Sequence, residues 1–130
     1  MNYPNAQANG GRAAGNNQQA GAALLSSSSI TGDDVVNLQD ENLGTIHDIV
    51  IDTAEGKIRY AVLASGGFLG MGDRLFAIPW RALTQDRENK RFKLDVNAER
   101  LKNAPGFDKD NWPNMADSTW NSTVESFYAR

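Results

Sequence analysis

The sequence predicts a small, mainly β domain, a barrel or a sandwich built from about five short strands. Three observations lead to this fold class. β-branched and aromatic residues are frequent over residues 30–96, they alternate with polar residues in several segments, and polar turns separate those segments. The segments follow one another too closely for helical crossovers between parallel strands, so we expect an antiparallel sheet.

The first two strands are expected on either side of a polar turn. Val35 and Val36 belong to a short strand, and a turn follows at residues 40–42. The second strand covers residues 43–52, where a run of β-branched residues is typical of a buried strand. A hairpin loop then ends at Gly56, which is free to adopt positive φ.

The later strands are predicted mainly from their alternation. Apolar positions recur at every second residue over 58–64, and a further strand runs over 75–80 with Pro79 close to its end. A charged turn at 86–90 precedes the last clear strand, over 92–96. No long helix interrupts this series.

Composition divides the chain into three parts. Residues 1–29 are rich in Asn, Gln, Gly, Ala and Ser, and we expect a flexible polar tail because such a segment buries too little apolar surface to offset its ordering entropy. Residues 30–96 hold the β domain. Residues 97–130 form a helical, aromatic-rich C-terminal extension, in which Asn97 can cap a helix over 98–103 and Ser118 a final helix.

The final helix carries a single apolar stripe. Trp120, Val124, Phe127 and Tyr128 fall at positions i, i+4, i+7 and i+8. A stripe of this kind is buried either on the barrel of its own chain or on another chain. The four residues are therefore candidate interface residues.

Composition and charge exclude several classes of function. The 130-residue chain has no cysteine, which excludes disulfides, thiolate metal sites and cysteine nucleophiles. The net charge is −3, and Asp86 and Glu88 interrupt the densest basic stretch, so the charge distribution disfavours nucleic-acid binding. No segment approaches the roughly 20 apolar residues of a membrane helix, and the start has no basic leader, so we expect a cytoplasmic protein without a membrane span.

The polar residues do not form a catalytic or metal-binding pattern. His47 is the only histidine, and Asp48 beside it on a strand points to the opposite face. Acidic residues at 33–34, 40–41 and 108–110 are interpreted as solvated turns and helix caps. We therefore predict no catalytic residue, no metal site and no cofactor, and no enzymatic activity.

A glycine-rich segment at 66–72 is the most distinctive feature of the sequence. A strand rather than a helix follows it, which disfavours phosphate binding. Phe68, Leu69 and Met71 are expected at a loop tip, where they either tuck under the barrel or meet a partner. These three residues complete the set of candidate interface residues.

The order of several short motifs resembles the bacterial stand-alone branch of the PRC-barrel family. The resemblance covers about residues 29–120 and rests on the following segments: 30–37, Leu43-Gly44, 49–52, 56–63, 66–70 with Asp73, 76–80, 101–108 and 111–113. It implies a small, strongly bent antiparallel β-barrel. Related barrels occur in the H subunit of photosynthetic reaction centres and in a ribosome-maturation factor, so the resemblance implies a docking or assembly module without a recognised active site.

Three functional hypotheses remain open on the sequence. The leading one is a non-catalytic protein-interaction module that associates with itself through sheet edges, the glycine-rich loop and the C-terminal stripe. The alternative is an RNA- or ribosome-associated factor, which would need a basic face. The third is a small-ligand-binding barrel, which would need a pocket with converging polar groups.

Overall fold

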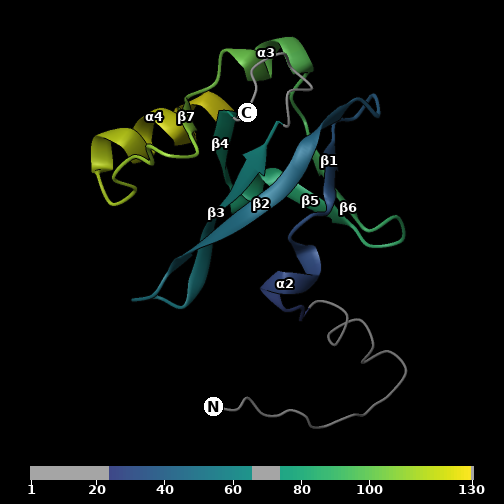
Figure 1. Ribbon diagram of the computed structural model, residues 1–130, viewed down its shortest axis with the longest axis horizontal. Coiled ribbons are helices and arrows are strands. Elements are labelled where there is room, and N and C mark those ends of the chain that lie inside the picture. Colours follow the sequence, from purple (N-terminus) through teal and green to yellow (C-terminus); the bar gives the residue numbers. More distant parts are fainter. Residues whose placement is uncertain (1–23, 66–73, 130) are drawn as a thin grey trace, which may run out of the picture.

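The computed structural model describes residues 24–65 and 74–129 (Figure 1). Seven strands form one sheet in the order β5-β6-β1-β2-β3-β4-β7. The strands are β1 (Asp34–Val36), β2 (Asn42–Asp52), β3 (Lys57–Ala64), β4 (Arg74–Pro79), β5 (Leu83–Asp86), β6 (Arg91–Leu94) and β7 (Gly106–Asp108). The helical elements are α2 (Ser27–Ile30), the short 3-10 helix η2 (Trp80–Ala82), α3 (Ala98–Lys102) and α4 (Ser118–Tyr128).

The expected mainly β fold is confirmed, and the sheet is strongly bent but not closed. β2 curves across the sheet (Figure 1), and its register against β3 shifts between Ile46 and Asp48 and again between Val50 and Ile51. Bulges of this kind bend a strand and increase its twist. In the described part of the chain, β5 and β7 are the two ends of the strand order.

One pairing departs from the antiparallel expectation. β1 and β6 run parallel, with Val35 opposite Phe92. The two strands are separated by β2 to β5 along the chain, so no tight hairpin has to join them and either direction is available to them. Every other pairing in the sheet is antiparallel.

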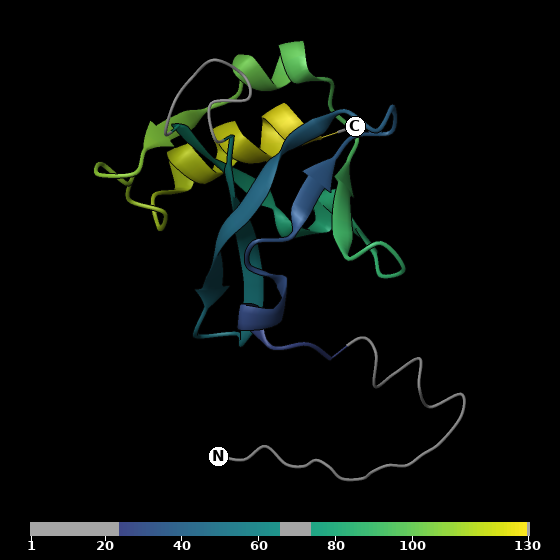
Figure 2. The ribbon, with the colours of Figure 1, turned by 45° about the vertical axis from the view of Figure 1, so that its right-hand side comes forward.

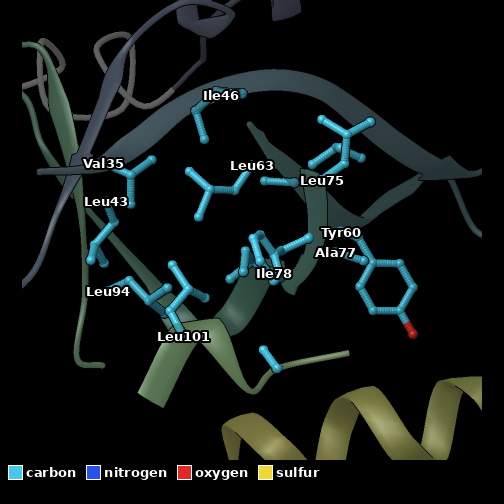
Figure 3. Close-up of a cluster of buried hydrophobic side chains, with 14 of the residues drawn as sticks. Val35, Leu43, Ile46, Tyr60, Leu63, Leu75, Ala77, Ile78, Leu94 and Leu101 are labelled. Atoms are coloured by element: carbon cyan, nitrogen blue, oxygen red, sulfur yellow. The ribbon is translucent and has the colours of Figure 1, made fainter. Parts of the chain in front are cut away.

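The concave side of the sheet encloses the core (Figure 3). The two faces of β3 and β4 are both covered, because buried residues follow one another without alternation in Tyr60–Leu63 and in Leu75–Ile78. Because both faces of β3 and β4 are buried, segments outside the sheet must pack on the face that does not line the core. The buried side chains labelled in the close-up are Val35, Leu43, Ile46, Tyr60, Leu63, Leu75, Ala77, Ile78, Leu94 and Leu101.

Gly44 allows β2 to approach β3 closely. Its φ is +139°, and a Cβ at this position would lie 2.2 Å from the carbonyl oxygen of Ala64. Only glycine fits that space and that backbone conformation without a shift of the main chain. Gly56, in the β2–β3 turn, also has positive φ at +70°, but nothing lies within 4 Å of a Cβ built there.

The C-terminal extension contains the two expected helices. Asn97 caps α3, because its side chain accepts a hydrogen bond from the amide of Arg100 at 2.7 Å. The cap of α4 is Asp117 and not Ser118, since Oδ1 of Asp117 accepts from the amide of Thr119 at 3.2 Å. Either residue type caps well, and the structure places the first helical residue at Ser118.

Helices α3 and α4 lie at one end of the molecule, and the tip of the β2–β3 hairpin lies at the other. Figures 1 and 2 agree on this arrangement, with α2 at the hairpin's end. α4 packs beside β4. No helix in the described residues is long and apolar enough to cross a membrane.

Candidate protein-interaction surfaces

The two halves of β2 have different neighbours. Asn42–Thr45 pairs with β1, and the backbone of Ile46 bonds to Asp33 at 2.9 Å and to Gly32 at 2.8 Å. From His47 to Asp52 β2 pairs with β3 on one side, and no other described strand pairs with it on the opposite side. We call residues 47–52 the free edge of β2. It is about 20 Å long at the usual rise per residue.

The free edge carries β-branched apolar side chains. Ile49 and Val50 are partly buried against the core, whereas Ile51 is 54 % exposed. Ile58 lies opposite Ile51 on β3. Unpaired strand edges of this composition are favourable sites for strand addition.

The adjacent histidine and aspartate considered in the sequence analysis, His47 and Asp48, lie on the same edge. His47 and Asp48 are both exposed. Oδ1 of Asp48 accepts a hydrogen bond from the amide of Ile49 at 2.8 Å. A carboxylate engaged with the adjacent backbone does not orient the imidazole, so the pair lacks the arrangement of a general base.

Asp52 shapes the hairpin at the end of the free edge. Its Oδ1 accepts from the amides of Ala54 at 3.0 Å and Glu55 at 3.1 Å, and its Oδ2 lies 3.8 Å from Nη1 of Arg59. These bonds are those of a turn-forming Asp.

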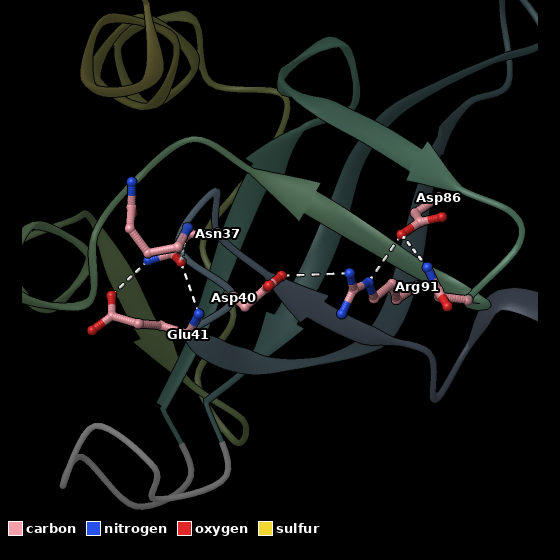
Figure 4. A network of polar contacts seen from close by, with 7 residues as sticks. Asn37, Asp40, Glu41, Asp86 and Arg91 are labelled. Carbon is pink, nitrogen blue, oxygen red and sulfur yellow. Dashed lines mark hydrogen bonds and ion pairs between the residues drawn. The ribbon is translucent and has the colours of Figure 1, made fainter.

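The β1–β2 turn and the β5–β6 hairpin are joined by a polar network (Figure 4). Arg91 contacts Asp86 at 3.0 Å through Nε and Asp40 at 3.4 Å through Nη2. Hydrogen bonds from Asn89 and Arg91 lower the pKa of Asp86. The Asp40 carboxylate is thus committed to an ion pair that holds two turns together.

Asn37 forms the second part of this network. Its Oδ1 accepts from the amides of Gln39 at 3.0 Å and Glu41 at 2.9 Å, and its Nδ2 donates to the Glu41 carboxylate at 2.6 Å. The 40–41 acidic pair therefore serves the turn. Among the described residues, no group of three or more His, Cys, Asp or Glu could hold a metal ion.

The C-terminal stripe lies on the barrel of its own chain. Val124 is fully buried and Tyr128 is 3 % exposed, while Trp120 and Phe127 are partly buried against the core. The rings of Tyr60 and Trp120 meet edge to face at 5.4 Å between centroids. Val124 and Tyr128 therefore offer almost no surface to a partner, and the assignment of the partly buried Trp120 and Phe127 to an interface stays a prediction.

Polar contacts hold α4 to the barrel as well. The hydroxyl of Tyr60, which points toward α4 in Figure 3, donates to Asn121, and Arg81 forms an ion pair with Glu125. The guanidinium of Arg100 lies 4.3 Å from the ring centroid of Phe127. α4 is therefore an integral part of the fold.

The glycine-rich segment at residues 66–72 is not among the residues that the structure describes. The candidate interface residues Phe68, Leu69 and Met71 lie outside the described residues, as do residues 1–23 of the tail predicted over residues 1–29. Their assignment stays a prediction.

A hollow beside α4 bears on the ligand-binding hypothesis. It has a volume of about 280 Å³ and is lined by Arg81, Ala82, Leu94, Asp95, Val96 and Tyr128. The hydroxyl of Tyr128 is buried and has no hydrogen-bond partner among the described residues. Ligand sites are usually larger than this and hold several convergent polar groups, so the hollow is a poor ligand pocket.

Comparison with known families decides what kind of fold this is. The model of the PRC-barrel domain matches residues 24–101, which is more than half of the chain. The chain belongs to the PRC-barrel domain family. The resemblance found in its motifs is thereby confirmed. The family match ends within α3, so α4 and its contacts lie beyond the matched region.

Comparison with solved structures gives a more distant similarity. A putative 16S ribosomal RNA processing protein RimM from Pseudomonas aeruginosa shares 18 % sequence identity with this PRC-barrel chain, with a TM-score of 0.42. The alignment covers 58 % of this chain and 45 % of that protein, so this chain matches less than half of its length. No curated protein matches the sequence significantly.

Proposed function

We propose that this PRC-barrel chain is a non-catalytic module that assembles with protein chains, including copies of itself. The observation that carries the proposal is the free edge of β2, where unpaired backbone and exposed apolar surface coincide. Strand addition to such an edge gains main-chain hydrogen bonds and buries apolar side chains together.

The distribution of polar groups supports the same proposal. In the part of the chain that the structure describes, the turn network contains two ion pairs, which Arg91 forms with Asp40 and Asp86. Asp117 caps a helix, and Asp52 forms a turn. These residues stabilise turns and a helix end, and they do not converge on a pocket as a catalytic acid, base and nucleophile would.

The mass of the intact assembly tests this proposal. We expect native mass spectrometry of the protein isolated from its own cell, and light scattering of the purified chain at high micromolar concentration, to show species heavier than the 14.2 kDa monomer. A strict monomer that copurifies with no stoichiometric protein would contradict it.

A second candidate, association with RNA or the ribosome, is favoured by family membership, because a related barrel occurs in a ribosome-maturation factor. The basic residues available for it on the β5–β6 hairpin are Arg87, Lys90 and Lys93, since Arg91 is bound by two carboxylates. Glu88 lies among them, and so few cations give only weak phosphate binding at physiological salt. Filter binding at physiological salt distinguishes the two, and we expect weak RNA affinity; submicromolar, salt-sensitive binding would favour this candidate.

A further inference from the structure

The free edge of β2 is bordered by more carboxylates than cations. Asp48 is exposed on the edge, and Asp33 and Asp34 stand where the edge begins. Within residues 24–65 and 74–129, none of these three carboxylates makes an ion pair. Glu55 is exposed at the hairpin tip. An incoming strand therefore meets a negative surface along an apolar edge.

The nearby cations do not neutralise this surface. Arg59 is engaged with Asp52 at 3.8 Å and lies 5.5 Å from the ring centroid of Tyr60. Lys57 stands on β3, one strand away from the edge. Arg59 and Lys57 lie on the far side of β2 from an added strand. Arg91 lies opposite Asp34 on β6, but it already contacts Asp86 and Asp40.

One backbone amide of the free edge is hydrogen-bonded to a side chain of the same strand. The amide of Ile49 donates to the side chain of Asp48, a local bond that a ladder carbonyl from an added strand would replace. Once released, the exposed Asp48 carboxylate is solvated by water and open to pairing with a cation. A lysine or arginine on the added strand supplies one.

We propose that the free edge of β2 binds an extended segment of a partner protein in which basic residues alternate with β-branched apolar ones. This site and partner chemistry rest on the proposed protein-binding function and make it specific. The backbone of the segment pairs with residues 47–52, its apolar side chains cover Ile51, and its cations face Asp48, Asp33 and Asp34.

A second copy of β2 is a poorer occupant of the same edge. Antiparallel self-pairing centred on the free edge places Asp48 of each copy opposite Ile51 of the other. Each Asp48 would then face an apolar side chain, and residues 47–52 of the second copy contain no lysine or arginine to pair with it. Copies that associate through other surfaces are unaffected by this restriction.

The probe is a short capped peptide that alternates lysine with valine, compared with a matched peptide in which glutamate replaces lysine. Titration into the full-length protein, followed by NMR, should shift the amides of residues 47–52 with the lysine peptide. Ile51→Lys should weaken that binding by about tenfold or more. Thr84→Lys, which adds the same charge to the exposed edge of β5, should leave it unchanged.

Charge reversal makes the test specific. Asp48→Lys should reverse the preference, so that the glutamate peptide binds more tightly than the lysine peptide. Equal binding of the two peptides, shifts confined to other strands, or no binding to the wild-type edge would overturn the inference. A native complex that persists unchanged in the Ile51→Lys protein would overturn it while leaving the proposed function intact, whereas the absence of any complex would remove both.

Discussion

The β2–β3 hairpin and helix α4 both present apolar residues at the border of the sheet, but only α4 is closed off within the chain. Val124 and Tyr128 are buried, and a hydrogen bond and an ion pair tie α4 to the barrel. Ile51 on the hairpin is 54 % exposed, and no described strand covers its edge. Apolar surface therefore serves stability at one end of the molecule and remains available at the other.

The same contrast exists within β2 itself. Its first part, Asn42–Thr45, pairs with β1, and β3 joins on the other side from Thr45 onward. Gly44 in this part permits a close backbone approach to β3. Its second half has β3 on one side only. Substitutions in the two halves should thus differ sharply in their cost to the free energy of unfolding.

The largest difference is expected between two glycines. Gly44→Ala should destabilise the protein by about 4 kcal/mol or prevent folding, because its Cβ would lie 2.2 Å from a main-chain oxygen. Gly56→Ala at the hairpin tip meets no atoms and should cost only about 1 kcal/mol for its positive φ. Urea melts of both variants measure this, and equal costs would contradict the close approach of β2 to β3.

A smaller difference is expected between the stripe of α4 and the free edge. Val124→Ala removes fully buried methyl groups and should cost about 2 kcal/mol. Ile51→Ala removes an exposed side chain and should change stability by less than about 0.5 kcal/mol. If Val124→Ala instead left the melt unchanged and altered the oligomer mass, the stripe would face a partner.

Removal of the hydroxyl group should change the free energy of unfolding differently at the two buried tyrosines. Tyr60→Phe leaves Asn121 without its partner and should cost about 1 kcal/mol. Tyr128→Phe removes a hydroxyl that has no partner in the part of the chain that the structure describes, so it should be neutral or slightly stabilising near pH 7. Thermal melts of the two variants measure this, and an equal loss in both would indicate that the Tyr128 hydroxyl is hydrogen-bonded.

The effect of Tyr128→Phe on stability is the smallest of these near neutral pH, and it should grow at high pH. Burial raises the pKa of Tyr128 above its ordinary value of 10.0, so above that pH the unfolded chain loses a proton that the folded chain retains. Unfolding is favoured as pH rises, and the stability present below pH 10 is progressively lost. Tyr128→Phe should therefore fall less steeply in stability between pH 9 and about pH 11; an unchanged slope would show that Tyr128 titrates normally.

Strands with a strong local pattern could be predicted from the sequence. The alternation of residues 58–64 and the β-branched run of β2 correspond to observed strands. β5 was missed because Thr84 and Gln85 are polar and carry no apolar period. β7 was missed because its three residues become a strand only through pairing with β4.

The candidate site was less predictable for a related reason. The stripe on α4 is visible in the sequence, but whether it faces the barrel or a partner depends on tertiary packing. The free edge of β2 depends on the short length of β1, which pairs with only the first part of a much longer strand. Such a mismatch between two strands leaves no mark in the local pattern of either one.

The most direct test of this account is amide hydrogen exchange in the isolated full-length chain at low concentration. The account predicts strong protection across residues 42–46, with fast exchange at the amides of residues 47–52 that face away from β3. Addition of the native partner or of the lysine peptide should slow exchange at those amides and leave α4 unchanged. Uniform protection along the whole of β2 in the isolated chain would contradict it.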